Sequence, residues 1–279
     1  MSHFLLYNGS FYKNDEPLIG ADNRGLRYGD GVFETLCCIN GKIRFENLHF
    51  DRLLEGLQLL GFELPGYLTR SFIADQVNKL CLKNHHSYAR VRINIFRGNG
   101  GLYDAENHFP NYIIQSWKLA DKAFSLNENG LAAGIYRDAA KTMDRFSNLK
   151  TNNFLPYSMA ALYAKSQQWN EAFVLNSNGR ICDATIANVF LVKNTIISTP
   201  ALSEGCIAGV MRRFLLEELQ KGGTPVKEEP ITEAALLDAD EVFLTNSVKG
   251  IRWVQSSGDK MFTSKVTQEL FNSLLKKMQ

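Results

Sequence analysis

The chain has 279 residues, of which 45% are hydrophobic and 22% are charged, and its formal net charge at pH 7 is +2. This length supports one large domain or two modest ones, and the composition is ordinary for a globular enzyme. The small net charge argues against a protein that binds nucleic acid mainly through phosphate contacts. No apolar run reaches membrane length, and the first residues lack a basic region followed by a long apolar stretch. We therefore expect a cytoplasmic protein that does not interact with a membrane.

The cysteines and histidines do not predict a disulfide framework or a metal site. The five cysteines are odd in number and lack Cys-x-x-Cys spacing, so we expect small core residues in a reducing compartment. The five histidines show no ligand-like spacing apart from the adjacent His85 and His86 in a polar turn, and we predict no bound metal.

The N-terminal part alternates turn signals with apolar patterns. Asn8 and Gly9 supply the positive-φ residues of a hairpin turn. Asn47 is a candidate N-cap for a helix that Gly61 ends, with Phe50, Leu53, Leu54, Leu57 and Leu60 on one side. In chain order we expect a hairpin over 4–12, a shaped loop over 22–31, a second hairpin over 32–45, and helices over 47–60 and 68–82.

Residues 88–97 read as a strand with two different faces. Val91, Ile93 and Ile95 fall on one face, whereas Arg90, Arg92 and Asn94 fall on the other. Two arginines on one strand face can clamp a carboxylate. The alternative is the solvated face of an edge strand. The glycine-rich turn that follows lacks the Lys-Ser/Thr ending of a P-loop and does not lead into a helical pattern, so we do not predict a phosphate loop there.

The polar, aperiodic stretch 121–130 is the best candidate for a linker. It separates a small N-terminal α/β domain (1–120) from a larger C-terminal α+β domain (131–279). In the larger domain we expect strands over 132–137, 171–175, 188–192, 195–198 and 241–245, and helices near 154–168, 210–221 and 264–278. Because ligand sites prefer domain interfaces, we expect the active site between the two domains.

Lys150 lies between a small polar cluster and an apolar helical pattern. From Phe154 onward the apolar positions Leu155, Met159, Leu162 and Tyr163 recur at helical spacing, so Lys150 lies just ahead of one apolar helix face. An amine at the edge of a core is a better nucleophile toward carbonyls, because desolvation favours its neutral form. The alternative is an ordinary solvated lysine.

Three downstream stretches complement this lysine. Residues 179–190 contain the lone carboxylate Asp183, residues 205–212 place a glycine before a helix N-terminus, and Ser247 supplies a hydroxyl after a strand. Pyridoxal 5'-phosphate needs an amine for its aldehyde, an anion for its pyridinium nitrogen and donors for its phosphate. The four stretches together offer all of these groups.

In order and spacing these stretches resemble the fold-type IV pyridoxal-phosphate enzymes, the class IV aminotransferase family. This family includes branched-chain aminotransferases, D-amino acid aminotransferases and 4-amino-4-deoxychorismate lyases, and the resemblance covers nearly the whole chain. It implies a two-domain α+β fold like that of D-amino acid aminotransferase, bound pyridoxal 5'-phosphate, and a homodimer with shared active sites.

The resemblance assigns specific residues to the aldehyde, the ring nitrogen and the phosphate of the cofactor. Lys150 matches the Schiff-base lysine, which also shuttles the substrate proton. Asp183 falls where the family places an acidic residue, usually glutamate, against the pyridine nitrogen. Aspartate is one methylene shorter, so either the ring sits slightly deeper or a water bridges the gap. Asn188 matches the asparagine of the same motif. Phosphate ligands are implied at Arg52, at the helix N-terminus of Val210 and Met211, and at Ser247.

The resemblance also implies a substrate pocket. Tyr28, Phe33 and Thr35 match its lining, and Tyr28 would reach in from the partner subunit. Arg90 and Arg92 are the candidate ligands for a substrate carboxylate.

Within the family, the sequence favours a lyase. The loop after residue 97 lacks the Arg-x-His pair of D-amino acid aminotransferases. Branched-chain enzymes have Gly-Ile-Thr-Arg at the phosphate helix and a tyrosine soon after the lysine, whereas this chain has Val210 and Met211 in the first motif and Phe154 and Leu155 after the lysine. Leu102 stands where lyases can have a basic residue, which matches the substrate less well.

We therefore predict 4-amino-4-deoxychorismate lyase, forming 4-aminobenzoate and pyruvate. The alternative is an L-amino acid transaminase of branched-chain type that uses 2-oxoglutarate. A non-catalytic cofactor-binding protein is disfavoured, because phosphate binding alone needs neither Lys150 nor Asp183.

Overall fold

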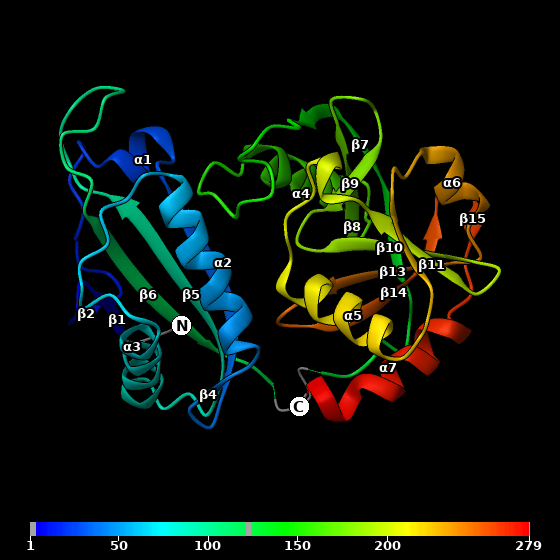
Figure 1. Cartoon of the computed structure of the whole chain (residues 1–279), viewed down its shortest axis with the longest axis horizontal. Helices are drawn as coiled ribbons and strands as arrows, with labels where there is room; N and C mark the ends of the chain where they lie inside the picture. Colours follow the sequence, from blue (N-terminus) through cyan, green and yellow to red (C-terminus); the bar gives the residue numbers. More distant parts are fainter. Residues whose placement is uncertain (1–3, 121–123, 279) are drawn as a thin grey trace. The chain divides into compact units, whose positions relative to one another are not determined.

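The computed structural model describes residues 4–120 and 124–278 and divides the chain into two compact units. Unit 1 contains the described residues up to 120 together with 149–153, and unit 2 contains residues 124–148 and those from 154 onward. The short segment that carries Lys150 therefore folds with the N-terminal part of the chain. The predicted linker over 121–130 begins at 121–123, which lie outside the described residues. Helices and strands are mixed in the chain as expected, which confirms the α+β class (Figure 1).

Unit 1 is built on a six-stranded sheet in the order β2-β1-β6-β5-β3-β4, in which every neighbouring pair is antiparallel. Its strands are β1 (Phe4–Tyr7), β2 (Ser10–Lys13), β3 (Gly31–Ile39), β4 (Lys42–Ile43), β5 (Tyr88–Arg97) and β6 (Pro110–Lys118). Its helices are α1 (Arg24–Tyr28), α2 (Glu46–Leu59) and α3 (Arg70–Lys83). Both predicted hairpins are present, and Asn8 has the positive φ (46°) that its turn requires.

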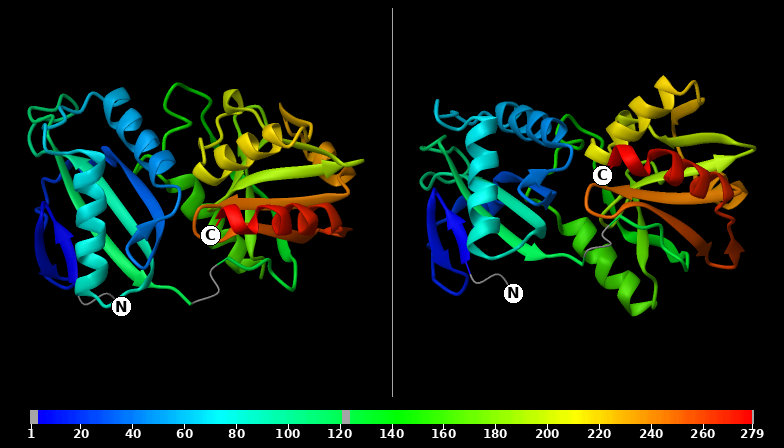
Figure 2. Two further views of the ribbon diagram at one scale, coloured as in Figure 1. Left: turned by 60° about the horizontal axis from the view of Figure 1, so that its bottom comes forward. Right: turned by 90° about the horizontal axis from the view of Figure 1, so that it is seen from below.

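Helices α2 and α3 pack their apolar sides on one face of this sheet (Figure 2). Val91, Ile93 and Ile95 of β5 are buried in that core, whereas Arg90 is exposed and Arg92 is half-buried. The predicted alternation of β5 is therefore confirmed. It leaves a polar sheet face opposite the helices, because successive side chains of a strand point to opposite sides.

Two local predictions in unit 1 are wrong. Asn47 does not cap α2, because the helix begins one residue earlier, at Glu46, and its N-cap is Phe45 in the left-handed conformation (φ 53°). The segment 22–31 is not only a loop, since it contains α1. Asn23 caps that helix by accepting a hydrogen bond from the Leu26 N–H, and Gly29 ends it with a φ of 63°.

Unit 2 is built on a nine-stranded mixed sheet in the order β12-β11-β10-β13-β14-β7-β8-β9, with β15 paired to β14. Its strands are β7 (Leu131–Lys141), β8 (Glu171–Asn176), β9 (Ile181–Ala184), β10 (Asn188–Lys193), β11 (Ile196–Pro200), β12 (Val226–Glu229), β13 (Glu241–Asn246), β14 (Gly250–Ser257) and β15 (Lys260–Met261). Its helices are α4 (Leu155–Ser166), η1 (Leu202–Glu204), α5 (Val210–Lys221), α6 (Glu233–Asp238) and α7 (Lys265–Met278).

Strands β8 and β10 of this sheet are buried on both faces. Along β8, Phe173 belongs to the core on the side of α6, and its neighbour Val174 belongs to the core on the side of α4. This accounts for the nearly continuous apolar runs of β8 and β10. At the start of β13, the buried carboxylate of Glu241 accepts hydrogen bonds from the Val266 and Thr267 N–H groups (2.8 and 2.9 Å) and so holds the first turn of α7.

The predicted apolar face of α4 is wrong except at Tyr163, which is half-buried and packs against the core. Leu155, Met159 and Leu162 are exposed, and the buried face consists of Tyr157, Ala160 and Ala164. None of the helices among the described residues is long and apolar enough to span a membrane. All five cysteines are buried and free, as expected for small core residues.

Candidate functional site

The segment around Lys150 pairs with the start of β3. The Phe33 N–H donates to the Lys150 carbonyl (2.9 Å), and the Asn152 N–H donates to the Gly31 carbonyl (2.9 Å). A side chain at Gly31 would collide with the Ile95 carbonyl, which explains the glycine there. These backbone bonds place the Lys150 Nζ 4.5 Å from the centre of the Phe33 ring. Lys150 is half-buried and does not lie in a helix.

The polar face of the unit 1 sheet collects most of the predicted substrate residues. The Arg92 guanidinium lies 3.8 Å from the centre of the Phe33 ring, and Thr35 is the cross-strand partner of Arg92 on the same face. The Phe33 ring thus makes cation–π contacts with both Arg92 and Lys150. Arg90, next along this face, stacks over Trp117 at 4.4 Å.

Tyr28 lies at the end of α1, where its ring packs 5.5 Å from that of Tyr103. The structure therefore groups Phe33, Thr35 and Arg92 with Lys150, and it attaches Tyr28 to the loop after β5.

Arg52 on α2 is held by a buried carboxylate. Its Nε and Nη2 donate to the two oxygens of Glu34 (2.7 and 2.6 Å), and Glu34 also accepts from His49 Nδ1 (2.7 Å). Burial alone would raise the pKa of Glu34, but the paired Arg52 and the His49 hydrogen bond lower it from its ordinary 4.5 to about 2. Burial lowers the pKa of His49, so its neutral ring donates to Glu34. This clamp fixes the guanidinium of Arg52 against the sheet.

We expect Glu34→Gln to destabilise the protein by about 3 kcal/mol at pH 7, because it removes the buried carboxylate that pairs with Arg52. A carboxyl whose pKa falls on folding contributes stability above its unfolded pKa and loses it as the pH falls through the folded one. The difference in unfolding free energy between wild type and variant should therefore have its full size above about pH 4.5 and shrink as the pH approaches about 2. Urea denaturation between pH 2.5 and 7 measures it, with the exposed Glu55→Gln on α2 as control. A pH-independent difference would contradict the assignment.

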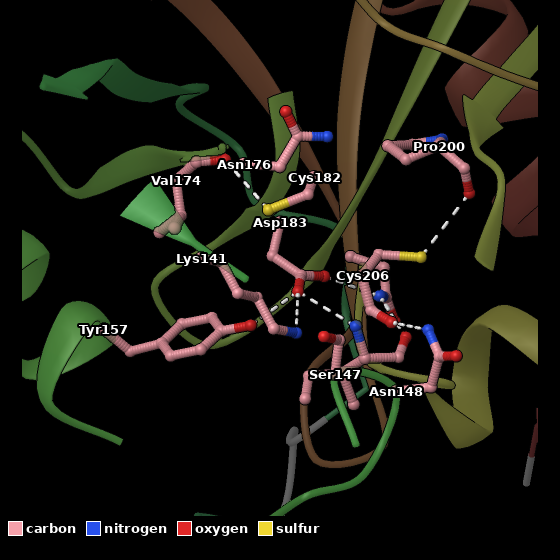
Figure 3. Close-up of polar contacts among 12 residues, drawn as sticks. Lys141, Ser147, Asn148, Tyr157, Val174, Asn176, Cys182, Asp183, Pro200 and Cys206 are labelled. Carbon is pink, nitrogen blue, oxygen red and sulfur yellow. Dashed lines mark hydrogen bonds and ion pairs between the residues drawn. The ribbon is translucent and has the colours of Figure 1, made fainter. Parts of the chain in front are cut away.

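Asp183 on β9 is the centre of a buried polar cluster in unit 2 (Figure 3). Its Oδ2 accepts from the Tyr157 hydroxyl (2.6 Å), the Ile207 N–H (2.9 Å) and the Lys141 Nζ (3.4 Å). Its Oδ1 accepts from the Asn188 side-chain amide (2.8 Å). Burial raises the pKa of Asp183, and the Lys141 cation and these hydrogen bonds oppose that rise. Each carboxylate oxygen has about two acceptor positions, so Oδ1, with Asn188 as its one donor among the described residues, keeps a position for a further donor.

The same asparagine connects this cluster to the start of α5. Asn188 also donates to the Ile207 carbonyl (2.8 Å), and a Cβ at Gly209 would lie 1.8 Å from its Oδ1, so only glycine fits there. Gly209 is the N-cap of α5 and provides no side-chain cap for the first-turn N–H groups of Val210 and Met211. A helix start of this kind favours a bound anion.

The turn after β13 completes the candidate residues. Asn246 Oδ1 accepts from the N–H groups of Val248 and Lys249 (3.1 and 2.7 Å), which shapes the turn that carries Ser247. Before it, Thr245 is the cross-strand partner of Asn188, and its buried hydroxyl has no hydrogen-bond partner among the described residues. An unsatisfied buried hydroxyl beside Asn188 suits a site that receives a polar ligand.

The loop before Lys150 is anchored to the segment that leads into α5. Asn148 donates to the carbonyls of Leu202 and Cys206 (2.9 and 2.6 Å), and the Ala208 N–H donates back to the Asn148 carbonyl (3.0 Å). Ser147 closes the loop by donating to the Thr142 carbonyl (2.9 Å). The path of the chain up to Asn148 is thus fixed within unit 2 (Figure 3).

Sequence reasoning missed two members of the Asp183 cluster. Tyr157 lies on the buried face of α4, which the apolar pattern assigned to the opposite side. Lys141 is the last residue of β7 and is only 8% exposed, although a lysine at a strand end is usually solvated. The helical period from Ala160 and Ala164 back to Tyr157 was the only available signal for the tyrosine. The sequence contains no comparable signal for Lys141, which is 42 residues from Asp183.

Comparisons with known proteins converge on one family. The family described as amino-transferase class IV matches residues 31–257. An aminodeoxychorismate lyase of Bacillus subtilis is 30% identical over 252 residues, which cover 88% of this chain and 83% of that protein. Among solved structures, a 4-amino-4-deoxychorismate lyase from Pseudomonas aeruginosa has a TM-score of 0.83 at 25% identity and covers 98% of both chains. A branched-chain aminotransferase from Thermoproteus uzoniensis has a TM-score of 0.87 at 21% identity, and the match covers 100% of this chain and 95% of that one. At this identity the match supports the fold and not a function.

Proposed function

Because the chain belongs to the class IV aminotransferase family, we propose that it is a 4-amino-4-deoxychorismate lyase, which forms 4-aminobenzoate and pyruvate. The family uses pyridoxal 5'-phosphate, and the chain is accordingly a pyridoxal-phosphate enzyme. The cofactor supplies an aldehyde that bonds to amines and a ring that accepts the electrons of a cleaved Cα–H bond.

The residues present fit this cofactor. Asp183 keeps one acceptor position on Oδ1 for a ring N–H, and the start of α5 offers backbone donors and the positive end of a helix dipole to a phosphate. The unsatisfied hydroxyl of Thr245 lies beside Asn188, on the same part of the sheet. We propose that Val210, Met211, Ser247 and Arg52 hold the phosphate and that Asp183 faces the ring nitrogen.

On the substrate side, we propose that the Lys150 amine bonds to the cofactor and, once displaced, moves the substrate proton. Phe33 would hold Lys150 and Arg92 on one sheet face, where Arg92 or Arg90 binds a substrate carboxylate. We also propose a homodimer, in which Tyr28 contributes to the pocket of the partner subunit, as the family resemblance implies.

The position of the Tyr157 hydroxyl favours a lyase over a transaminase. Tyr157 is the first tyrosine after Lys150, and its hydroxyl donates a hydrogen bond to Asp183 at 2.6 Å. Phe154 stacks on the Tyr157 ring (4.2 Å) and has no hydroxyl of its own. Met211 likewise replaces the threonine of branched-chain enzymes. A transaminase must reprotonate the cofactor and release a keto acid, which demands well-placed polar groups. A lyase whose product becomes aromatic gains driving force and demands fewer of them.

The test is a substrate panel on the purified holoenzyme. We expect rapid formation of pyruvate and 4-aminobenzoate from 4-amino-4-deoxychorismate, and slow conversion of the cofactor to its aminated form by L-leucine or L-glutamate. The aminated cofactor and the products are followed by absorbance and chromatography. If leucine aminates the cofactor at about one per second or faster while the chorismate derivative is inert, the enzyme is a branched-chain type transaminase instead.

A further inference from the structure

The buried environment of Asp183 contains a cation that its role as a ring-nitrogen partner does not require. Lys141 is 8% exposed, and its Nζ lies 3.4 Å from Oδ2 of Asp183 (Figure 3). Burying an ammonium group is costly, so its presence beside this carboxylate calls for a reason. The inference below rests on the proposed contact between Asp183 and the ring nitrogen.

The distances separate two kinds of contact with Asp183. Tyr157, Ile207 and Asn188 donate at 2.6, 2.9 and 2.8 Å, which are lengths of strong hydrogen bonds, and they fix the carboxylate in three directions. Lys141, at 3.4 Å, is too far for a strong charge-assisted bond. Its Coulomb interaction falls only as the inverse of distance and remains large in a buried site. Lys141 therefore acts on Asp183 mainly through its positive charge and contributes little to fixing the orientation of the carboxylate.

The other titratable groups around Asp183 do not change this balance. Burial raises the pKa of Tyr157 and Cys182 well above their ordinary values, and it raises the pKa of Cys206 to about 12, so all three are neutral between pH 5 and 9. Arg212 on α5 is paired with Glu228 on β12 at 2.6 Å, and the two charges offset each other. Among the residues that face the carboxylate in the described part of the chain, Lys141 and Asp183 set the local charge.

We propose that Lys141 tunes the cofactor ring by neutralising part of the Asp183 charge. With an unpaired carboxylate, a ring nitrogen would meet one full negative charge and hold its proton tightly. With Lys141 in place it meets an ion pair, and the cation also repels a second positive charge on the ring. The ring is then a weaker electron acceptor, which a reaction driven by aromatisation tolerates better than a transamination does. Lys141 is on this basis a specificity-determining residue that acts through Asp183.

The test reads the ring nitrogen directly. The holoenzyme is loaded with pyridoxal 5'-phosphate labelled with ¹⁵N in the ring, and the ¹⁵N chemical shift is followed by NMR between pH 5 and 9. We expect the wild-type ring to lose its proton within this range. Lys141→Met, which is of similar length and uncharged, should raise the midpoint by about one unit or more. Lys141→Gln keeps a hydrogen-bond donor to Asp183 without the charge, and it should raise the midpoint in the same way. Lys141→Arg restores the charge and should return the midpoint toward that of the wild type.

Two further variants make each outcome decisive. Tyr157→Phe removes a hydrogen bond from the same oxygen but no charge, and it should shift the midpoint less than Lys141→Met. Asp183→Asn should lower the midpoint, since it leaves the Lys141 cation alone. If Asp183→Asn does not affect the ¹⁵N signal, Asp183 does not face the ring and the proposed site is wrong. If Asp183→Asn moves the signal but the two uncharged Lys141 variants do not, or if the wild-type ring stays protonated throughout, only the tuning role of Lys141 is overturned.

Discussion

Lys150→Ala should abolish covalent retention of pyridoxal 5'-phosphate after borohydride reduction and should lower turnover by at least about 10⁴-fold. The physical reason is that Lys150 has two proposed roles, as the amine that bonds to the cofactor and as the base that moves the substrate proton. General acid–base catalysis alone contributes about 10²–10⁴-fold, and the loss of the covalent bond adds to it. Lys150 is held at the start of β3 by backbone bonds at its own carbonyl and at the Asn152 N–H, whereas Lys42 pairs with Ile39 at the other end of the same strand.

Reduction, proteolysis and peptide mass mapping measure this result. Wild type should give a reduced adduct on the peptide that contains Lys150, and Lys42→Ala, at an exposed lysine of the same unit, should behave like wild type. The variant should still unfold near the wild-type temperature, because the bonds that hold this segment come from the backbone. An adduct on any other lysine of the wild-type protein would show that Lys150 is not the bonded amine.

The strands and helices that depend on simple periodicity were predictable from the sequence. The alternation of β5 follows from Val91, Ile93 and Ile95, and the bounds of α5 follow from Gly209 and the amphipathic pattern after it. These elements have one clear apolar face each, so tertiary packing agrees with the local pattern.

Packing decided the elements that the sequence did not predict. In α4 the exposed Leu155, Met159 and Leu162 are larger and more apolar than the buried alanines, so a hydrophobicity pattern selects the wrong face. Small residues let the helix approach β7 and β8 closely, which periodicity cannot reveal. The start of α2 was missed for a different reason, because a phenylalanine with a positive φ is an unusual N-cap.

The residues of the candidate site also fall into two groups, those that the sequence could indicate and those that depend on packing. Lys150, Asp183 and Asn188 stand in stretches whose order resembles a known family, so the sequence could single them out. Lys141 and Tyr157 reach Asp183 only because β8 joins β7 to β9 in the unit 2 sheet and α4 packs on β7 and β8. Their chemistry depends on burial and on distances between residues far apart in the chain, and neither is encoded in a local pattern.

Asp183→Asn is expected to slow removal of the substrate Cα proton by about 10²-fold or more while it weakens cofactor binding far less. A pair of opposite charges shifts a buried equilibrium by one to three pKa units, so loss of the carboxylate removes much of the preference for a protonated ring. Most of the affinity for the cofactor comes from phosphate donors, such as those at the start of α5, which the substitution leaves in place. Asparagine is nearly isosteric and can still accept from Tyr157 and Ile207.

Single-turnover kinetics with a Cα-deuterated substrate separate this effect from binding. The isotope effect on the variant should approach its full value, because proton removal becomes limiting, and the cofactor dissociation constant should change by less than about tenfold. Glu241→Gln is the matched control, since it removes a buried carboxylate of the same unit that holds α7. It should lower thermal stability and leave the single-turnover rate near that of the wild type. An Asp183→Asn enzyme with a wild-type rate and isotope effect would remove Asp183 from the chemical step and leave it a structural anchor for Tyr157, Asn188 and Ile207.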